Sequence, residues 1–166
     1  MRNLRVRKAT RLQGYNYTES GAYFVTICAK NREHLFGETR NGSMEPDDCG
    51  RTAEKWWKDI PNHFIGTEID EYIVMPNHFH GIVWLVGAGF PRPGAATAPL
   101  PKLGKIIAYF KYQSTKNINI IRQTSGLPVW QRNYHERIIR NDAELFAIRG
   151  YIIENPLKWD VDPERW

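Results

Sequence analysis

The stretch Ile69–Val86, with the sequence IDEYIVMPNHFHGIVWLV, decides how the middle of the chain folds. Its two halves, Ile69 to Met75 and Phe79 to Val86, are rich in β-branched and aromatic residues, and Pro76-Asn77 separates them. This composition predicts two strands joined by a short turn. Any polar side chains next to that turn are then held on a rigid sheet.

His78 and His80 are the most informative polar residues of this stretch. Successive side chains on a strand point to opposite faces, so both imidazoles project the same way while Phe79 points back. Two adjacent imidazoles are a candidate metal-binding pair, although single histidines are more often ordinary hydrogen-bonded residues. Neither a zinc-protease helix nor a deaminase cysteine set accompanies the pair. With an amide oxygen, the pair suits Mg²⁺ or Mn²⁺ with positions open for phosphate oxygens.

Tyr151 and Asn155 form a second candidate group. They stand four residues apart on a predicted helix and therefore share one of its faces. The alternative interpretations are a packed tyrosine ring with a solvated hydroxyl and an asparagine that caps the helix before Pro156. Spacing alone does not choose among the tyrosines that compete for the same chemical role, namely Tyr72, Tyr109, Tyr112, Tyr134 and Tyr151.

Apolar spacing and turn residues predict the remaining elements. We expect a strand over 23–30, hairpin-turn chemistry at Arg40-Asn41-Gly42-Ser43, a helix over about 50–64 capped by Asp47 or Asp48, a helix over 103–121 ended by Gly126-Leu127-Pro128, a strand over 129–139, and a helix from an Asn141 cap to about Glu154, stopped by Pro156.

The order of these elements is βαββαβα, which indicates an α+β fold. The natural architecture is a ferredoxin-like antiparallel sheet with helices on one face. The chain has 166 residues, which fits a single domain over 1–166. We expect a basic N-terminal arm over about 1–20 and a flexible Gly/Pro/Ala-rich loop over about 87–101.

Charge indicates the kind of partner. The net charge is +5, and 42% hydrophobic with 13% aromatic residues is typical of a folded globular protein. The basic residues are clustered along the chain. This clustering favours a polyanionic partner, with ordinary solvated surface as the alternative. The clustered basic residues are Arg2, Arg5, Arg7, Lys8, Arg11 and Lys30, then Lys102, Lys105, Lys111, Lys116 and Arg122, and finally Arg132, Arg137 and Arg140.

Cysteine content and hydropathy bear on the compartment. Only Cys28 and Cys49 are present, which gives no disulfide framework and suits a reducing cytosol. The basic N-terminus lacks the apolar stretch of a signal peptide, and Ile82 to Phe90 is too short for a membrane span. We therefore expect a soluble cytoplasmic protein without a membrane partner.

Several strings, taken together, resemble the REP-associated tyrosine transposases. This family is the host-adapted branch of the single-tyrosine HUH transposases, which act on single-stranded DNA. The similarity runs in order from about residue 8 to residue 160, and the 87–101 loop carries no family signature. The strings are RLQGYNY (11–17), GAYFVTIC (21–28), YIVMPNHFHG (72–81), VWQRNYHERIIR (129–140) and IRGYIIENPLKW (148–159).

The resemblance implies a role for each candidate residue. His78 and His80 match the metal-binding pair of the family, Asn155 matches its third polar ligand, and Tyr151 matches the nucleophile. The implied reaction is cleavage and transfer of single-stranded DNA at palindromic hairpins, with Mg²⁺ or Mn²⁺, through a 5′-phosphotyrosine intermediate. The host-adapted branch also implies a nucleoid-associated bacterial protein that works as a monomer rather than a dimer.

Substrate binding is expected from basic and aromatic segments, since bases stack on aromatic rings for about 1–3 kcal/mol each. In the resembled family such regions bind a repetitive extragenic palindrome and the tetranucleotide beside its hairpin. The candidate DNA-binding residues are Arg5, Arg7, Lys8, Arg11 and Tyr15 in the N-terminal arm, with Lys111, Lys116, Arg132 and Arg137 farther along the chain.

Two other classes of function stay open. One is a non-catalytic regulator that binds DNA hairpins and retains the site as a remnant. The other is an RNA-binding ferredoxin-like module, which the absence of an RNP-type string on the central strands disfavours.

Overall fold

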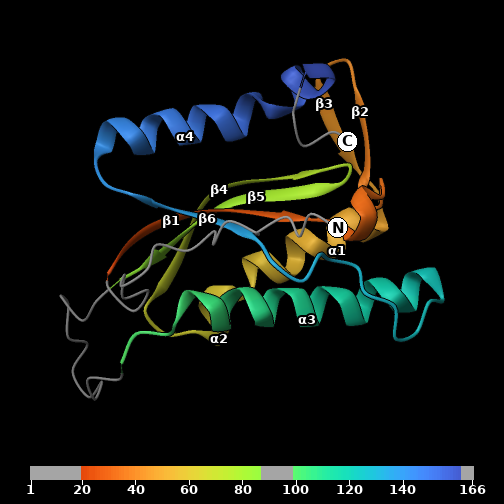
Figure 1. The fold of residues 1–166 in the computed structure, drawn as a ribbon, viewed down its shortest axis with the longest axis horizontal. Helices are drawn as coiled ribbons and strands as arrows, with labels where there is room; N and C mark the ends of the chain where they lie inside the picture. The colour runs from red at the N-terminus through yellow and green to blue at the C-terminus, as the bar shows by residue number, and fades with distance from the viewer. Residues whose placement is uncertain (1–19, 87–98, 162–166) are drawn as a thin grey trace, which may run out of the picture.

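The computed structural model describes residues 20–86 and 99–161. The expected basic arm over about 1–20 lies almost wholly outside these ranges, as does most of the expected loop over 87–101. The expected strands and helices that position the candidate residues belong to one sheet or pack on it (Figure 1).

The core of the protein is a four-stranded antiparallel sheet with the order β4-β5-β1-β6. Strands β1 and β5 are the two inner strands, and they pair over their whole length from Gly21↔Leu85 to Cys28↔His78. Strands β4 and β1 therefore run parallel with β5 between them, and β5 and β6 run parallel with β1 between them. This is the split βαβ arrangement of ferredoxin-like folds. The α+β, ferredoxin-like fold class is confirmed. The strands are β1 (Gly21–Cys28), β4 (Thr67–Met75), β5 (His78–Leu85) and β6 (His135–Ile139).

Helices cover both faces of this sheet (Figure 1). Helix α1 (Asp48–Lys58), the short α2 (Ile60–His63) and α3 (Leu103–Arg122) pack on one face, against alternate residues of the central strands such as Tyr23, Val25 and Phe79. Helix α4 (Asp142–Glu154) packs on the other face, which adds a third layer to the expected arrangement of helices on one face. The physical reason is that the inner strands are apolar on both sides, so each face requires a cover.

A small hairpin extends from one end of the sheet. Strands β2 (Gly37–Arg40) and β3 (Ser43–Pro46) pair around Asn41 and Gly42, which both have positive φ. Two consecutive positive φ angles define the tight hairpin turn predicted from this sequence. The remaining elements are two 3-10 helices, η1 (Lys30–Arg32) and η2 (Asn155–Val161).

The predicted helix starts are confirmed, and Asp47 rather than Asp48 caps α1. The Asp47 carboxylate accepts a hydrogen bond from the Gly50 amide at 2.9 Å, and the Asn141 side chain accepts one from the Glu144 amide at 2.8 Å. Both contacts satisfy amides that the first helical turn leaves without partners. Helix α4 ends at Glu154 as expected, but the chain continues directly into η2, so Pro156 changes the helix type without ending helical geometry.

The strand predicted over 129–139 is wrong in its first half. Only His135–Ile139 forms β6; Trp130 makes an isolated antiparallel bridge to Ala29, and the residues between Gln131 and His135 take an irregular path. Trp130 turns into the core, where its indole nitrogen donates to Ser114 Oγ at 2.9 Å. The Lys111 ammonium donates hydrogen bonds to the backbone carbonyls of Gln131 and Asn133 at 2.9 and 3.1 Å, so these two carbonyls do not pair with β1.

Candidate functional site

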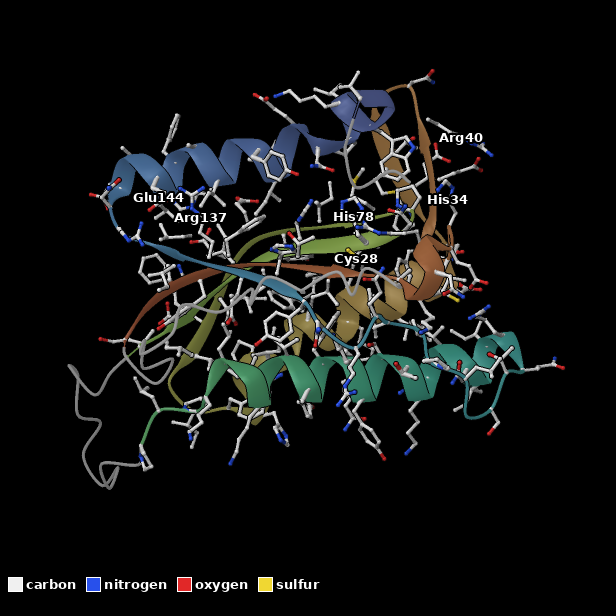
Figure 2. All side chains as sticks on the ribbon, in the orientation of Figure 1. Cys28, His34, Arg40, His78, Arg137 and Glu144 are labelled. Carbon is white, nitrogen blue, oxygen red and sulfur yellow. The ribbon has the colours of Figure 1, made fainter. Side chains whose placement is uncertain are left out.

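His78 and His80 meet on the face of the sheet that α4 covers. Both side chains are buried, and their Nε2 atoms lie 3.0 Å apart. Figure 2 labels His78 close to Cys28, its partner in the strand register, and near His34 of the loop that precedes β2. The strand alternation predicted from sequence therefore places the two imidazoles together, as expected.

The other nitrogen of each imidazole has a fixed partner. His78 Nδ1 lies 2.8 Å from the Asn77 amide oxygen, which can only accept, so Nδ1 carries the proton and Nε2 keeps its lone pair. His80 Nδ1 lies 2.8 Å from the hydroxyl of Thr26, which β1 places directly opposite His80. Such outer partners orient the ring and set the tautomer in metal-binding histidines.

Burial also sets the charge of this pair. Removal from water lowers the pKa of His80 well below its usual value of 6.5, and the nearby His78 adds to this effect. A neutral imidazole is the form that binds a metal ion. His80 is therefore held in the uncharged form that coordinates a metal ion.

Helix α4 and the start of η2 carry the other two candidate residues, Tyr151 and Asn155. The Tyr151 hydroxyl lies 3.4 Å from His80 Nε2, and the Tyr151 ring packs edge-on against the His80 ring. Tyr151 is 39% exposed, so the residue is reached by solvent while its hydroxyl lies beside His80. Asn155, one turn later, is only 2% exposed, and its Oδ1 has no hydrogen-bond partner.

These donors fit a divalent metal ion. The two Nε2 atoms lie at the hydrogen-bond distance of 3.0 Å, and a cation could take the place of the proton between them. Ligands at right angles on an ion with bonds of about 2.1 Å stand about 3.0 Å apart, which matches the observed separation. A buried amide oxygen without a partner costs about 1–3 kcal/mol, and an ion would satisfy it. Within residues 20–86 and 99–161, no cluster of three His, Cys, Asp or Glu side chains offers an alternative.

The competing tyrosines lie elsewhere. Tyr72 stacks on Phe79 at the opposite face of the sheet, and Tyr112 is exposed on α3. Tyr109 donates to Asp59 at 2.6 Å, and partial burial with this hydrogen bond raises its pKa to about 12. The ring of Tyr134 lies under the Lys111 ammonium. Of the five tyrosines considered, Tyr151 is the one beside the histidine pair in the described chain.

Sequence reasoning did not identify several residues that complete the site. The sequence does not indicate the contact of Thr26 with His80, because a strand register cannot be derived from one sequence. For Asn77 it predicts a place in the turn and no contact with His78. Trp159 of η2 is nearly buried, and its ring stacks 6.0 Å from the His78 ring. Its only sequence signal was its place eight residues after Tyr151 in the last family-like string.

The expected DNA-binding residues fall into three places. Lys111, Lys116 and Arg132 line an open groove of about 460 Å³ between α3 and the 126–132 segment, on the face away from Tyr151. Burial lowers the pKa of Lys111 to about 8, although its three backbone carbonyl partners favour the charged form. Arg137 lies on the α4 side and pairs with Glu144 (Figure 2). The predicted contacts Arg5, Arg7, Lys8, Arg11 and Tyr15 lie outside the described residues.

Comparisons with known proteins agree with this geometry. The chain is 39% identical to an uncharacterised protein of Haemophilus influenzae, over 94% of this chain and 91% of that protein. The two proteins belong to one family. No protein-family model matches the chain.

A solved structure identifies the fold. A REP-associated tyrosine transposase bound to a REP hairpin superposes with a TM-score of 0.60, over 89% of this chain and 73% of that chain, at 21% identity. The chain shares the fold of this transposase. The resemblance drawn from its sequence is thereby confirmed at the level of the fold. In the described part of this transposase fold, no helix has the length and apolar character needed to span a membrane.

Proposed function

We propose that the protein cleaves and transfers single-stranded DNA, with Tyr151 as the nucleophile. The observation that carries the proposal is the 3.4 Å approach of the Tyr151 hydroxyl to His80 Nε2, which in turn lies 3.0 Å from His78 Nε2. This approach occurs in a fold shared with a transposase whose solved structure holds a REP hairpin. The proposed reaction class is transesterification of a phosphodiester.

We further propose that His78, His80 and Asn155 bind one Mg²⁺ or Mn²⁺ ion. When bound, the ion would withdraw charge from a non-bridging phosphate oxygen and from the departing 3′ oxygen. Asn77 and Thr26 hold the two imidazoles in the required orientation through their Nδ1 atoms. Burial favours the neutral form of His80.

Tyr151 performs the covalent step of the proposed reaction. Its phenolic oxygen releases its proton and bonds to the phosphorus, and the bond between phosphorus and the 3′ oxygen breaks. The departing oxygen takes up a proton and leaves as a free 3′-hydroxyl, while the 5′ end stays on the protein as a phosphotyrosine. A 3′-hydroxyl reverses the step by the same exchange of bonds, so strands can be joined without a nucleotide cofactor.

The proposed substrate is a DNA hairpin beside a single-stranded segment. The groove between α3 and the 126–132 segment offers the Lys116 and Arg132 cations and the exposed Tyr112 ring. Cations contact the phosphate backbone, and an aromatic ring stacks on an unpaired base. The REP hairpin held by the structural neighbour belongs to the same class of ligand.

We also propose that a monomer is sufficient for activity. The two histidines, the asparagine and the tyrosine all come from one chain, since α4 packs on the sheet that carries β5. In this proposal the domain spans 1–166, with the arm over about 1–20 as an additional DNA contact. Activity is then expected to scale linearly with protein concentration.

The test is a cleavage assay with a labelled hairpin that carries single-stranded flanks, with and without Mn²⁺ or Mg²⁺. The wild-type protein is expected to form a covalent protein–DNA product only with metal. Tyr151→Phe is expected to lose this product and keep hairpin affinity, while the matched control Tyr72→Phe retains both. A covalent product from Tyr151→Phe would overturn the nucleophile assignment. Metal-independent hairpin binding without cleavage would favour the non-catalytic regulator.

A further inference from the structure

Helix α4 carries apolar side chains on the face toward the sheet and also on its exposed side. Leu145, Ile148 and Ile152 pack on the sheet. The outward side chains of α4 and the adjoining η2 include Phe146 at 80% exposure, Ile153 at 60% and Leu157 at 70%. Apolar burial has little directional preference, so a helix with two apolar faces gains similar free energy from packing either of them. Burial alone therefore does not explain why Tyr151 is held above the histidines.

A directional contact is provided by β4. The register between β4 and β5 shifts between Ile69 and Tyr72, which marks a β-bulge at Asp70. Asp70 is adjacent to Ile69, which packs on the α1 and α3 side, so alternation along the strand places the Asp70 carboxylate on the α4 side of the sheet. The carboxylate there accepts a hydrogen bond from the Trp84 indole at 2.9 Å and another from the Glu71 amide at 2.7 Å. Neither of these bonds involves α4, so they fix the orientation of Asp70 independently of that helix.

Arg149 of α4 binds this carboxylate with two hydrogen bonds. Its Nε lies 2.8 Å from Asp70 Oδ1, and its terminal nitrogen lies 2.6 Å from Oδ2. A planar guanidinium that donates to both oxygens fixes angle as well as distance. Because Arg149 lies two residues before Tyr151 on the same rigid helix, the bidentate contact also determines where the Tyr151 hydroxyl lies.

We propose that Asp70 and Arg149 are positioning residues, which set the rotation of α4 and so hold the Tyr151 hydroxyl at His80. The inference rests on the proposed function of Tyr151. A displacement of about 1 Å between reacting groups can lower a rate about 100-fold. The pair touches neither the histidines nor the proposed metal position, so it acts on the rate through geometry alone.

The test compares single-turnover formation of the covalent product at saturating hairpin and metal. Asp70→Asn is expected to lower this rate at least tenfold with unchanged hairpin affinity. Arg149→Lys keeps the charge but loses the two-point contact, and we expect an intermediate rate. The control Glu144→Gln removes the other ion pair between α4 and a strand, Arg137–Glu144, and is expected to keep the wild-type rate. Equal rates in all four proteins, or a loss of affinity instead of rate, would overturn the inference.

A second readout does not depend on activity. In protein labelled with 3-fluorotyrosine, ¹⁹F NMR reports the surroundings of residue 151, whose resonance is assigned with Tyr151→Phe. Asp70→Asn is expected to shift or split this resonance, and Glu144→Gln is expected to leave it in place. A split resonance together with an inactive wild-type protein would support the positioning role and overturn the proposed function. An unchanged resonance in Asp70→Asn would overturn the positioning role.

Discussion

The Tyr151 hydroxyl lies 3.4 Å from His80 Nε2, although the two residues are 71 positions apart in the chain. The contact exists because an inner strand presents His80 on one face of the sheet and α4 is the element that covers this face. Each half of the site is held by groups that take no part in the proposed chemistry. The functions of these supporting groups can therefore be separated by experiment.

Asn155→Leu is expected to separate metal binding from stability. The Asn155 amide oxygen is buried without a partner, so its loss should leave the free energy of unfolding unchanged or raise it by about 1 kcal/mol. Affinity for Mn²⁺, measured by isothermal titration calorimetry, should fall at least tenfold. Asn119→Leu is the matched control, because the buried Asn119 donates to the Leu127 carbonyl at 2.7 Å and its loss should destabilise the protein. Unchanged Mn²⁺ affinity in Asn155→Leu would contradict the ligand assignment.

Thr26→Val is expected to weaken metal binding without contact with the ion. The substitution keeps the shape of the side chain and removes the oxygen 2.8 Å from His80 Nδ1. Loss of such a partner typically lowers metal affinity by about 10–100-fold. Thr26→Ser retains the hydroxyl and should retain most of the affinity in the same titration. Equal Mn²⁺ affinity in the Val and Ser variants would show that this hydrogen bond does not support the site.

The ionisation of Asp70 should make the free energy of unfolding depend on pH in the acid range. Its hydrogen bonds from Arg149, opposed by desolvation and aided by Trp84, lower its pKa to about 2, below the value of about 3.9 for an unfolded chain. The unfolded state therefore binds the proton first, so this stabilisation is complete above about pH 4 and is lost as the pH falls toward 2. Urea unfolding between pH 6 and pH 2.5 should show a shallower acid decline in Asp70→Asn. Parallel declines in both proteins would contradict this assignment.

Two glycines should respond oppositely to alanine. A Cβ at Gly81 would lie 2.5 Å from the Trp57 ring, so Gly81→Ala should destabilise the protein by about 1–3 kcal/mol. A Cβ at Gly150 on α4 meets nothing within 4 Å, and Gly150→Ala should stabilise the protein by about 0.5–1 kcal/mol through helix propensity. Thermal unfolding measures both changes. A stable Gly81→Ala protein would indicate that Trp57 can move away from β5.

Lys111 and Lys116 should differ in their roles although both line the α3 groove. Lys116→Ala should reduce the salt dependence of hairpin binding by about one unit of slope and leave stability within about 0.5 kcal/mol. Lys111→Met removes the donor to the Gln131 and Asn133 carbonyls and should lower the free energy of unfolding by about 1–3 kcal/mol. Fluorescence anisotropy at several salt concentrations and urea unfolding distinguish the two effects. An unchanged salt slope in Lys116→Ala would place the DNA elsewhere.

Local sequence signals predicted most of the fold. Strand alternation gave β1, β4 and β5 with errors of a few residues, and the Asp47 and Asn141 caps marked the starts of α1 and α4. The failures occurred where a distant group decides the outcome. The strand expected from Val129 was shortened because Lys111, on another element, binds its backbone carbonyls.

The candidate site divides in the same way. Spacing alone placed His78 beside His80 on one strand face, and Tyr151 with Asn155 on one helix face. That these two faces meet depends on which side of the sheet α4 covers, and only the resemblance to a known family indicated it. Thr26 and Asp70 had no local signal, because a strand register and a bulge arise from pairing between distant segments.

The inner position of β1 and β5 has a consequence for how the protein opens. Backbone amides of the strands that carry Thr26, His78 and His80 are enclosed between neighbouring strands, so their hydrogen exchange should require global unfolding. Helix α4 is held by one layer of apolar contacts and the Asp70 ion pair. Its amides should therefore exchange through local detachment of the helix, at a lower free energy than global unfolding. Tyr151 can then leave and return while His78 and His80 stay in place on β5, which separates the lifetime of the catalytic geometry from the lifetime of the fold.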